Sequence, residues 1–400
     1  MIRRRIPRFY QGQILDILRK VFLKKTSPGE YIELFEEKFS QYTGTKFALA
    51  TCSGRHSLEL LLDAFGLKEG DEIILPSYTL KDLIRLIERK GFIPKLVDVE
   101  KSSFNINLDL ITGQISPKTK VIVATHIFGL PCNLRRILAI AEKYGLKVIE
   151  DCAHALGAKY DGKRVGSFGD AAFFSFETLK SINTFGGGMI TVNDEAIAGK
   201  IREKINSCPL DSNKILSKIL FTYIEYLIVR SPFYPFLISF FMFKPTTFII
   251  SKLYLLFHRN SRVKYSRFSD LQAFMGLKQL ENLDERNGKR SALAYALIER
   301  VSPIASIQES ESSEGRIFYF LVARLPFKKD IVKIRKKLIM QGIDAGIKDE
   351  ITDNCACILG RDRDFPAVEE IFKANLQLPL YDNMAEKDIE AVIRGLKKCL

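Results

Sequence analysis

The strongest constraint on the fold is an alternation of short apolar runs with longer amphipathic runs between about residues 46 and 195. The run 71–76 (DEIILP), for example, is followed by residues 80–90, whose apolar side chains recur at helical spacing. Continuous apolar strands separated by helices are typical of a mostly parallel sheet that helices cover on both faces. The sequence therefore predicts an α/β fold whose ligand site lies at the carboxyl ends of the strands.

Seven short apolar stretches are expected to form the strands of this sheet, and three segments with one apolar face are expected to form helices beside it. We expect strands at 46–51, 71–76, 93–99, 120–125, 147–151, 171–176 and 189–192, and helices at 56–65, 80–90 and 134–144. Polar side chains fall where these strands end, namely Ser53, Ser77, His126, Asp151 and Ser175.

The chain has 400 residues, which is too long for one simple core and fits two unequal domains. We divide it into a basic N-terminal segment (1–28), a large domain (29–208), an apolar, aromatic-rich segment (209–260), and a connecting helix with a small C-terminal domain (261–400). In the C-terminal part, a strand-like run and two amphipathic helices predict an α+β unit, at 317–323, 330–341 and 386–396.

The composition excludes several classes of protein. The formal net charge of +14 favours anionic partners, but no helix-turn-helix, zinc-finger or RNA-binding signature accompanies it, so we expect no nucleic acid. The seven cysteines are scattered, which indicates a reduced, cytoplasmic protein without a disulfide framework or a metal site. The first residues, MIRRRIPRFYQGQIL, lack the apolar core of a signal peptide.

The segment 209–258 is dense in Phe, Tyr, Leu and Ile, but charged residues and prolines interrupt it. Because none of its apolar stretches reaches the roughly 20 residues that span a bilayer, we expect no transmembrane helix. Three interpretations stay open: packing against the small domain or a dimer mate, insertion into an anionic membrane surface, and covering of an apolar substrate. The basic N-terminus, with Arg3, Arg4, Arg5 and Arg8, favours the membrane surface slightly.

The stretch from Val148 to Asn193 carries the chemistry. Asp151 ends a buried strand, where a charged acid is costly unless it is paired. Taken alone, Asp151 fits a structural salt bridge, Lys180 is an ordinary lysine, and the glycines 186–188 fit a turn. Taken together they indicate pyridoxal-phosphate (PLP) chemistry, in which a lysine binds the cofactor as a Schiff base and an acid pairs with its pyridine nitrogen.

A phosphate group needs hydroxyls and backbone amides, which a helix N-terminus supplies. Ser53 and Gly54 lie between an expected strand and an expected helix, as that role requires. Ser175 precedes Lys180 by five residues and is close enough in the chain to share the same pocket.

With these residues in this order, the chain resembles the DegT/DnrJ/StrS sugar aminotransferases, a branch of the fold type I PLP enzymes of the aspartate aminotransferase superfamily. The resemblance runs from about residue 29 to the C-terminus, is interrupted at 209–258 and is weak between about 300 and 370. It is carried by FEEKFSQYTGTKFALATCSG, GDEIILPSYT, FIPKLVDVE, THIFGLPCN, VIEDCAHALGAKYDGKRVGSFGDAAFFSF, GGGMITVND, FSDLQAFMGLKQLENLDE and LQLPLYDNM.

The resemblance implies a role for each matching residue. Lys180 matches the catalytic lysine that binds the cofactor and moves protons, and Asp151 matches the acid at the pyridine nitrogen. His154 falls where the family places a glutamine or histidine near the phenolic oxygen of the ring. Residues that match the family's phosphate-binding positions are Ser175, Ser53, Gly54 and Arg55.

Four positions depart from the family pattern. Arg55 replaces a threonine, so it could add charge to the phosphate site or point elsewhere. Leu80 stands where the family commonly stacks an aromatic side chain on the ring. Phe185 replaces the first glycine of a Gly-Glu-Gly-Gly motif, and Tyr265 replaces an asparagine that reaches the partner subunit's phosphate. Family members that dehydrate sugars carry histidine in place of the lysine, so Lys180 argues against that branch.

The resemblance implies a homodimer that moves an amino group from L-glutamate to a keto sugar, most simply a nucleotide-activated one, for cell-surface polysaccharide or glycolipid synthesis. Two alternatives stay open. One is a PLP enzyme that acts on a lipid-linked or non-sugar acceptor at the membrane surface. The other is a catalytically silent, membrane-associated scaffold or regulator. The expected location is cytoplasmic, with a peripheral position at the inner face of the membrane if the apolar segment binds lipid.

Overall fold

The fold was analysed in a computed structural model of the chain. It describes residues 1–4, 6, 9–10, 12–22, 29–210, 212–234, 265–310, 315–326, 329–361 and 364–400. Residues 235–264, which form much of the predicted apolar segment, lie outside this part, as do Arg5 and Arg8.

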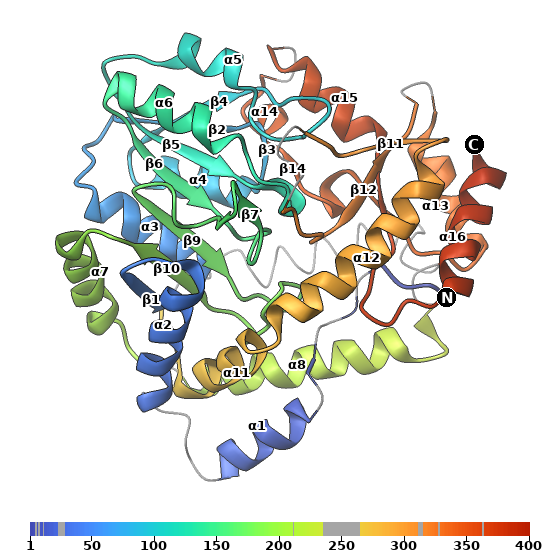
Figure 1. Ribbon diagram of the computed structural model, residues 1–400, viewed down its shortest axis with the longest axis horizontal. Helices are drawn as coiled ribbons and strands as arrows, with labels where there is room; N and C mark the ends of the chain where they lie inside the picture. Colours follow the sequence, from blue (N-terminus) through green and yellow to red (C-terminus); the bar gives the residue numbers. More distant parts are fainter. Residues whose placement is uncertain are drawn as a thin grey trace.

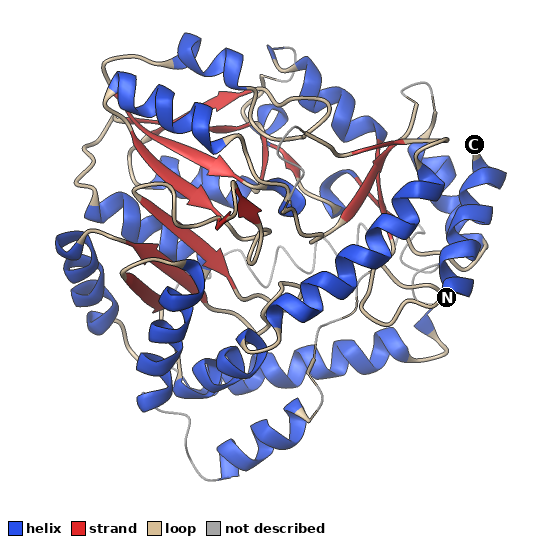
Figure 2. Ribbon diagram, viewed as in Figure 1, coloured by secondary structure: helices blue, strands red, loops and turns tan. Residues whose placement is uncertain are grey.

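A seven-stranded sheet forms the centre of the molecule (Figures 1 and 2). Its strands lie in the order β1-β10-β9-β6-β5-β2-β4, and only β10 runs against the others. The expected mostly parallel sheet is therefore confirmed. The strands are β1 (Phe47–Thr51), β2 (Glu72–Pro76), β4 (Ile93–Val97), β5 (Thr119–Thr125), β6 (Lys147–Asp151), β9 (Ala171–Ser175) and β10 (Gly188–Val192).

Helices cover both faces of this sheet because successive strand residues point to opposite sides. In β2, Ile73 and Leu75 join one hydrophobic core while Ile74 joins the other. The first core contains α3 (Gly54–Ala64), α4 (Lys81–Arg89) and α7 (Glu195–Ser207). The second contains α2 (Glu30–Thr43), α6 (Leu134–Tyr144) and α11 (Asp270–Leu280).

The long helix α12 (Leu283–Val301) leads from α11 to a smaller antiparallel sheet with its own core. That sheet has the order β11-β12-β15-β13, and Ile2 pairs with Ile343 beside it, which places the two chain ends near each other (Figure 1). Its elements are β11 (Ser306–Ile307), β12 (Leu321–Arg324), β13 (Gly346–Ile347), β15 (Asn375–Leu378), α13 (Ile331–Met340) and α16 (Glu386–Cys399).

Short elements complete the two sheets. β3 pairs with β14, and β7 pairs with β8. The bounds are β3 (Tyr78–Thr79), β7 (Lys159–Tyr160), β8 (Lys163–Arg164), β14 (Asp353–Asn354), α5 (Leu108–Ile111), α14 (Cys355–Ile358), α15 (Pro366–Ala374), and 3-10 turns at Thr112–Gln114, Ile127–Gly129 and Lys348–Glu350.

The strand expected at 317–323 begins later than predicted, at Leu321. Residues 317–319 pair instead with the loop after β5, where the Ile317 N–H donates to the Gly129 carbonyl at 3.1 Å and the Tyr319 N–H donates to the Phe128 carbonyl at 3.1 Å. Gly129 has a φ of +92°, and a Cβ there would lie 2.4 Å from the Ile317 carbonyl oxygen. Only glycine permits this close approach, which brings Tyr319 to the edge of the large sheet.

Two helices lie across the lower edge of the molecule in Figure 1, α1 (Gln13–Phe22) and α8 (Ser212–Arg230). Leu216 and Ile219 of α8 pack with the buried Phe185, whereas Phe221 and Leu227 on the same helix are exposed. Among the described helices, none has the length and apolarity that crossing a membrane requires. The described start of the apolar segment thus packs on the protein with one side and leaves the other side open.

The contact between α2 and α11 depends on Phe35, whose side chain is fully buried. A Cβ on Gly276 would lie 2.5 Å from the Phe35 ring, so the two helices approach as closely as glycine allows. We predict that Phe35→Ala lowers the free energy of unfolding by about 3–5 kcal/mol, because the ring leaves a cavity between the helices. Urea denaturation measures this change. Leu34→Ala, at a 40% exposed position of the same helix, is the control, and an equal loss in both variants would contradict the assignment.

Candidate active site

Asp151 is the last residue of β6 and is only 6% exposed. Its Oδ1 accepts a hydrogen bond from the Ala153 N–H at 3.0 Å. Burial raises the pKa of this carboxyl, and the backbone hydrogen bond and the attraction of Lys180 and His126 offset that rise only in part. The ionised carboxylate is therefore short of stabilising partners in this environment, and a cation placed beside it would be stabilised strongly.

Lys180 lies in the loop between β9 and β10 and is 8% exposed. Its backbone N–H donates to the Glu177 carbonyl at 2.8 Å, which fixes the turn that carries the side chain. Its Nζ lies 4.3 Å from the centre of the Tyr319 ring, on the ring face. A cation is attracted to an aromatic face, so Tyr319 holds the amine on the side of the site that faces the small sheet.

His154 lies between two aromatic rings. Its ring centre is 4.2 Å from that of Tyr319 and 5.8 Å from that of Phe128, with interplanar angles of 15° and 17°. The Phe128 N–H donates to His154 Nδ1 at 3.4 Å. Burial, followed by repulsion from Lys180, holds the pKa of His154 well below its usual range. The imidazole is therefore neutral, and its proton is on Nε2.

Ser53, Gly54 and Ser175 come together at the N-terminus of α3. Ser53 caps the helix by accepting the His56 N–H at 3.2 Å, and it forms a bridge with Gly187. A Cβ on Gly54 would lie 3.3 Å from the Ser175 Cβ, and one on Gly188 would lie 2.7 Å from the Ser53 carbonyl carbon. This turn packs closely only because both positions are glycine. The resulting group of hydroxyls and free helical N–H groups suits a phosphate.

Two sequence-predicted residues lie outside this cluster. The Arg55 guanidinium is paired with Asp82 of α4 and is half exposed, so it points away from the helix N-terminus of α3. Leu80 precedes α4 and is 42% exposed. The cofactor roles expected of these two residues stay predictions.

The positions that depart from the family pattern are also placed. Phe185 is fully buried against Phe9, with ring centres 5.8 Å apart. Tyr265 stacks on His56 of α3 at 4.0 Å, and its hydroxyl donates to Glu59 of the same helix. Tyr265 is thereby held by its own chain next to the proposed phosphate turn.

Sequence reasoning missed Tyr319 and Phe128. Both enclose His154, and Arg290 fixes Tyr319 by donating to its carbonyl oxygen at 2.9 Å. Phe128 has a positive φ of 53°, which is uncommon for an aromatic residue. Neither residue lies in a motif whose local pattern distinguishes it from a core aromatic, so the sequence alone carried no clear signal for them.

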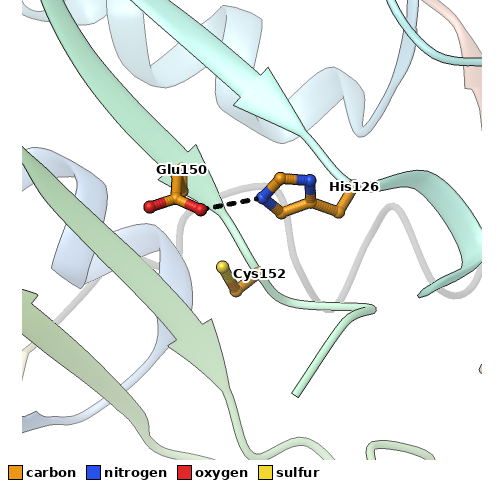
Figure 3. A group of neighbouring side chains, drawn as sticks. All are labelled: His126, Glu150 and Cys152. Carbon is orange, nitrogen blue, oxygen red and sulfur yellow. Dashed lines mark hydrogen bonds and ion pairs between the residues drawn. The ribbon is translucent and has the colours of Figure 1, made fainter. Parts of the chain in front are cut away.

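His126, Glu150 and Cys152 form a second buried polar group whose ligand atoms lie within 4.8 Å of one another (Figure 3). Glu150 accepts N–H bonds from Gly166, Phe168 and Gly169 at 2.8–2.9 Å, and it faces His126 Nε2 at 3.2 Å. The Cys132 N–H donates to His126 Nδ1, so Nε2 carries the proton and donates to Glu150. Since four N–H groups occupy the carboxylate, this group ties the loop after β8 to the sheet, and no metal is needed to explain it.

A lysine in the loop after a mostly parallel seven-stranded sheet, with an acid ending a neighbouring strand and a phosphate-type turn beside it, defines a PLP-dependent transferase of fold type I. The residues present fit the cofactor. Asp151 lacks a full set of partners for its charge, the glycines leave room at the phosphate turn, and Lys180 is buried beside both.

Residues 11–219 and 256–397 match the family model of the DegT/DnrJ/EryC1/StrS aminotransferases. The chain therefore belongs to this family, and the predicted family, fold, cofactor and enzyme class are confirmed: it is a PLP-dependent aminotransferase. The unmatched residues 220–255 fall within the apolar segment identified in the sequence.

Related proteins match over nearly the whole chain. The chain is 30% identical over 385 residues to GDP-perosamine synthase of Caulobacter vibrioides, covering 94% of this chain and 91% of that protein. It is 30% identical over 404 residues to dTDP-3-amino-3,6-dideoxy-alpha-D-galactopyranose transaminase of Aneurinibacillus thermoaerophilus, covering 99% and 97%. Among solved structures, an aminotransferase from Psychrobacter cryohalolentis matches with a TM-score of 0.78, 22% identity and 98% coverage of both chains, which shows the same fold.

The Glu150 network generates a pH prediction. The hydrogen bonds from His126 and the backbone outweigh the effect of burial, which acts first to raise it, and hold the pKa of Glu150 below its ordinary value of 4.5. Its stabilisation is thus fully present above pH 4.5 and is lost as pH falls through the lower folded-state value. We predict that Glu150→Gln lowers the free energy of unfolding at neutral pH by about 1–3 kcal/mol, because the amide leaves N–H donors unpaired.

The same substitution should remove the corresponding component of acid unfolding, which denaturation followed from pH 7 to pH 3 would reveal. Glu142→Gln on the exposed face of α6 is the control and should leave the curve unchanged. A Glu150→Gln curve that coincides with the wild-type curve would contradict the structural role.

Proposed function

We propose that this aminotransferase transfers an amino group from L-glutamate to a keto sugar carried on a nucleotide, for the synthesis of a surface polysaccharide or glycolipid. The observation that carries the proposal is the buried Lys180 beside Asp151 within this family's fold. The names of the relatives support the acceptor class, since they include two nucleotide-sugar enzymes and a spore coat polysaccharide biosynthesis protein, SpsC of Bacillus subtilis.

In this proposal the cofactor, when bound, supplies an electron sink for the carbon that gains or loses the amino group. Lys180 provides the amine that binds the cofactor and then moves a proton at the substrate carbon. Its burial keeps water away from that amine. Asp151 supplies the negative charge that holds a proton on the ring nitrogen, and the pairing offsets the cost of burying its carboxylate.

The remaining residues position the cofactor. The neutral His154 donates its Nε2–H toward the ring oxygen, while Phe128 and Tyr319 fix the plane of the imidazole. Ser53, Gly54 and Ser175 would bind the phosphate through hydroxyls and backbone N–H groups. Because Arg55 is paired with Asp82, we assign it a lesser part in phosphate binding.

We further propose a homodimer that associates peripherally with an anionic membrane surface. The exposed apolar side chains of α8 support this, and they lie beside basic residues of the N-terminal segment; they are Leu220, Phe221, Ile224, Leu227 and Ile228. The same face keeps a second function open, in which the acceptor is linked to a lipid. The presence of both Lys180 and Asp151 argues against a silent scaffold.

The spectrum of the cofactor-loaded protein tests the catalytic assignment. We predict a visible absorption band that L-glutamate bleaches, and its loss in Lys180→Ala because no amine remains to bind the cofactor. Lys143→Ala, at an exposed position of α6, is the control and should keep the band. A normal band in Lys180→Ala would contradict the assignment, and a band that glutamate does not change would contradict the donor.

Asp151→Asn tests the electrostatic role separately. The variant should still bind the cofactor, but its reaction with L-glutamate should be roughly 10²-fold slower or worse, because a neutral amide cannot hold the ring proton. Single-turnover absorbance measurements give this rate. A rate within a few fold of the wild type would show that another group performs this function.

Flotation with phosphatidylglycerol vesicles tests the membrane proposal. We expect the wild type to float and the double variant Phe221→Ser/Leu227→Ser to float much less, since both side chains leave the apolar face of α8. Leu110→Ser, at a 47% exposed position far from α8 in the chain, is the matched control. Equal flotation of all three proteins would argue against α8 as the lipid contact, and light scattering on the same samples would test the dimer.

A further inference from the structure

A cavity of about 330 Å³ opens beside the candidate active site. Leu179, which precedes Lys180, and Tyr319, whose ring holds the Lys180 amine, both line it. Its other walls come from the first residues of the chain, from the C-terminal end of α8 and from the small domain. A molecule in this cavity would therefore lie within reach of the residues that we assign to catalysis.

The cavity is strongly basic, since four arginines and one aspartate line it. Two of the arginines are held by protein groups. Arg4 pairs with Glu350 at 3.1 Å and with Asp344 at 3.6 Å. Arg290 pairs with Asp382 at 3.3 Å and donates to two backbone carbonyls, which fixes Tyr319. These two guanidinium groups are structural.

Arg3 and Arg230 differ from them. Arg3 donates through Nη2 to the Arg230 backbone carbonyl at 3.2 Å, and its Nε is buried without a hydrogen-bond partner among the described residues. The Arg230 guanidinium contacts the Tyr226 hydroxyl. Within the described part of the chain, neither arginine forms an ion pair with a carboxylate. Two cations brought together without an acid repel each other, and an anion bound between them would remove that repulsion.

The position of these residues relative to the family match is informative. Arg3 precedes the matched residues, and Tyr226 and Arg230 fall in the unmatched interval 220–255, whereas Leu179, Arg290 and Tyr319 lie within matched segments. One wall of the cavity is thus common to the family and the other is particular to this chain. Recognition of the amino donor is shared by the whole family, so the chain-specific wall points to the acceptor.

We propose that Arg3 and Arg230 bind the phosphate or diphosphate group of the acceptor in this cavity. The inference rests on the proposed function, because it takes the acceptor to be a phosphate-linked sugar. It adds a binding site that the apolar segment contributes: α8 closes the cavity with Arg230 while its outer face stays open to solvent. Both a nucleotide diphosphate and a lipid diphosphate present the chemistry that two guanidinium groups recognise.

Calorimetric titration of the cofactor-loaded protein tests this proposal, because the bound cofactor already fills its own phosphate site. The probes are inorganic pyrophosphate, guanosine and thymidine diphosphates, and farnesyl diphosphate. We expect pyrophosphate to bind, and Arg3→Gln and Arg230→Gln each to weaken it roughly tenfold or more, since a charge-assisted hydrogen bond is lost. Arg230→Lys should recover part of the affinity. Arg19→Gln, an exposed arginine of α1 outside the cavity, should bind like the wild type.

Tighter binding of a nucleoside diphosphate than of pyrophosphate would identify a nucleotide-linked acceptor, and tighter binding of farnesyl diphosphate would identify a lipid-linked one. Pyrophosphate that fails to bind, or that binds equally to wild type and to a folded Arg3→Gln/Arg230→Gln variant, would overturn the proposal. So would a double variant that loses reaction with glutamate more than it loses pyrophosphate, because the cavity would then hold the donor's carboxylates. Arginine-dependent pyrophosphate binding without any reaction with glutamate would support the cavity and contradict the proposed function.

Discussion

The site depends on one electrostatic relation, the attraction between a buried carboxylate and the cations around it. Asp151 lies where β6 ends, so the sheet determines its position, and burial raises its pKa more than the nearby Lys180 and His126 lower it. The charge is stabilised fully only when a further cation lies beside it. The protonated ring nitrogen of the cofactor meets this requirement, and the phosphate turn at α3 and the buried amine of Lys180 lie around the space where such a ring fits.

The rest of the fold brings these groups to one edge. Parallel strands carry Asp151, Ser175 and the turn after β1 to the same end of the sheet. Glu150, one residue before Asp151, points to the opposite side and ties down the loop from Gly166 to Gly169. The small domain contributes Tyr319, which reaches the site because Gly129 lets residues 317–319 approach the large sheet.

Much of this was predictable from sequence, for a physical reason. Buried strands are continuous apolar runs, so the strands of the large sheet were predicted to within a residue or two, and the acid at the end of one of them was visible as a conspicuous cost. Contacts between distant segments were not visible. The enclosure of His154 by Phe128 and Tyr319 depends on a loop with positive φ, and the pairing of Arg55 with Asp82 depends on how two helix ends meet. The late start of β12 has the same origin, because the residues before it pair with a loop and not with a strand.

The central claim is that Lys180 is the residue that carries the cofactor. The most direct measurement is borohydride reduction of the cofactor-loaded protein, which makes the bond to the lysine permanent, followed by digestion and mass spectrometry of the peptides. The account predicts one phosphopyridoxyl group per chain, on the peptide that contains Lys180. A label on another lysine, or no stable label on a protein that binds the cofactor, would contradict it.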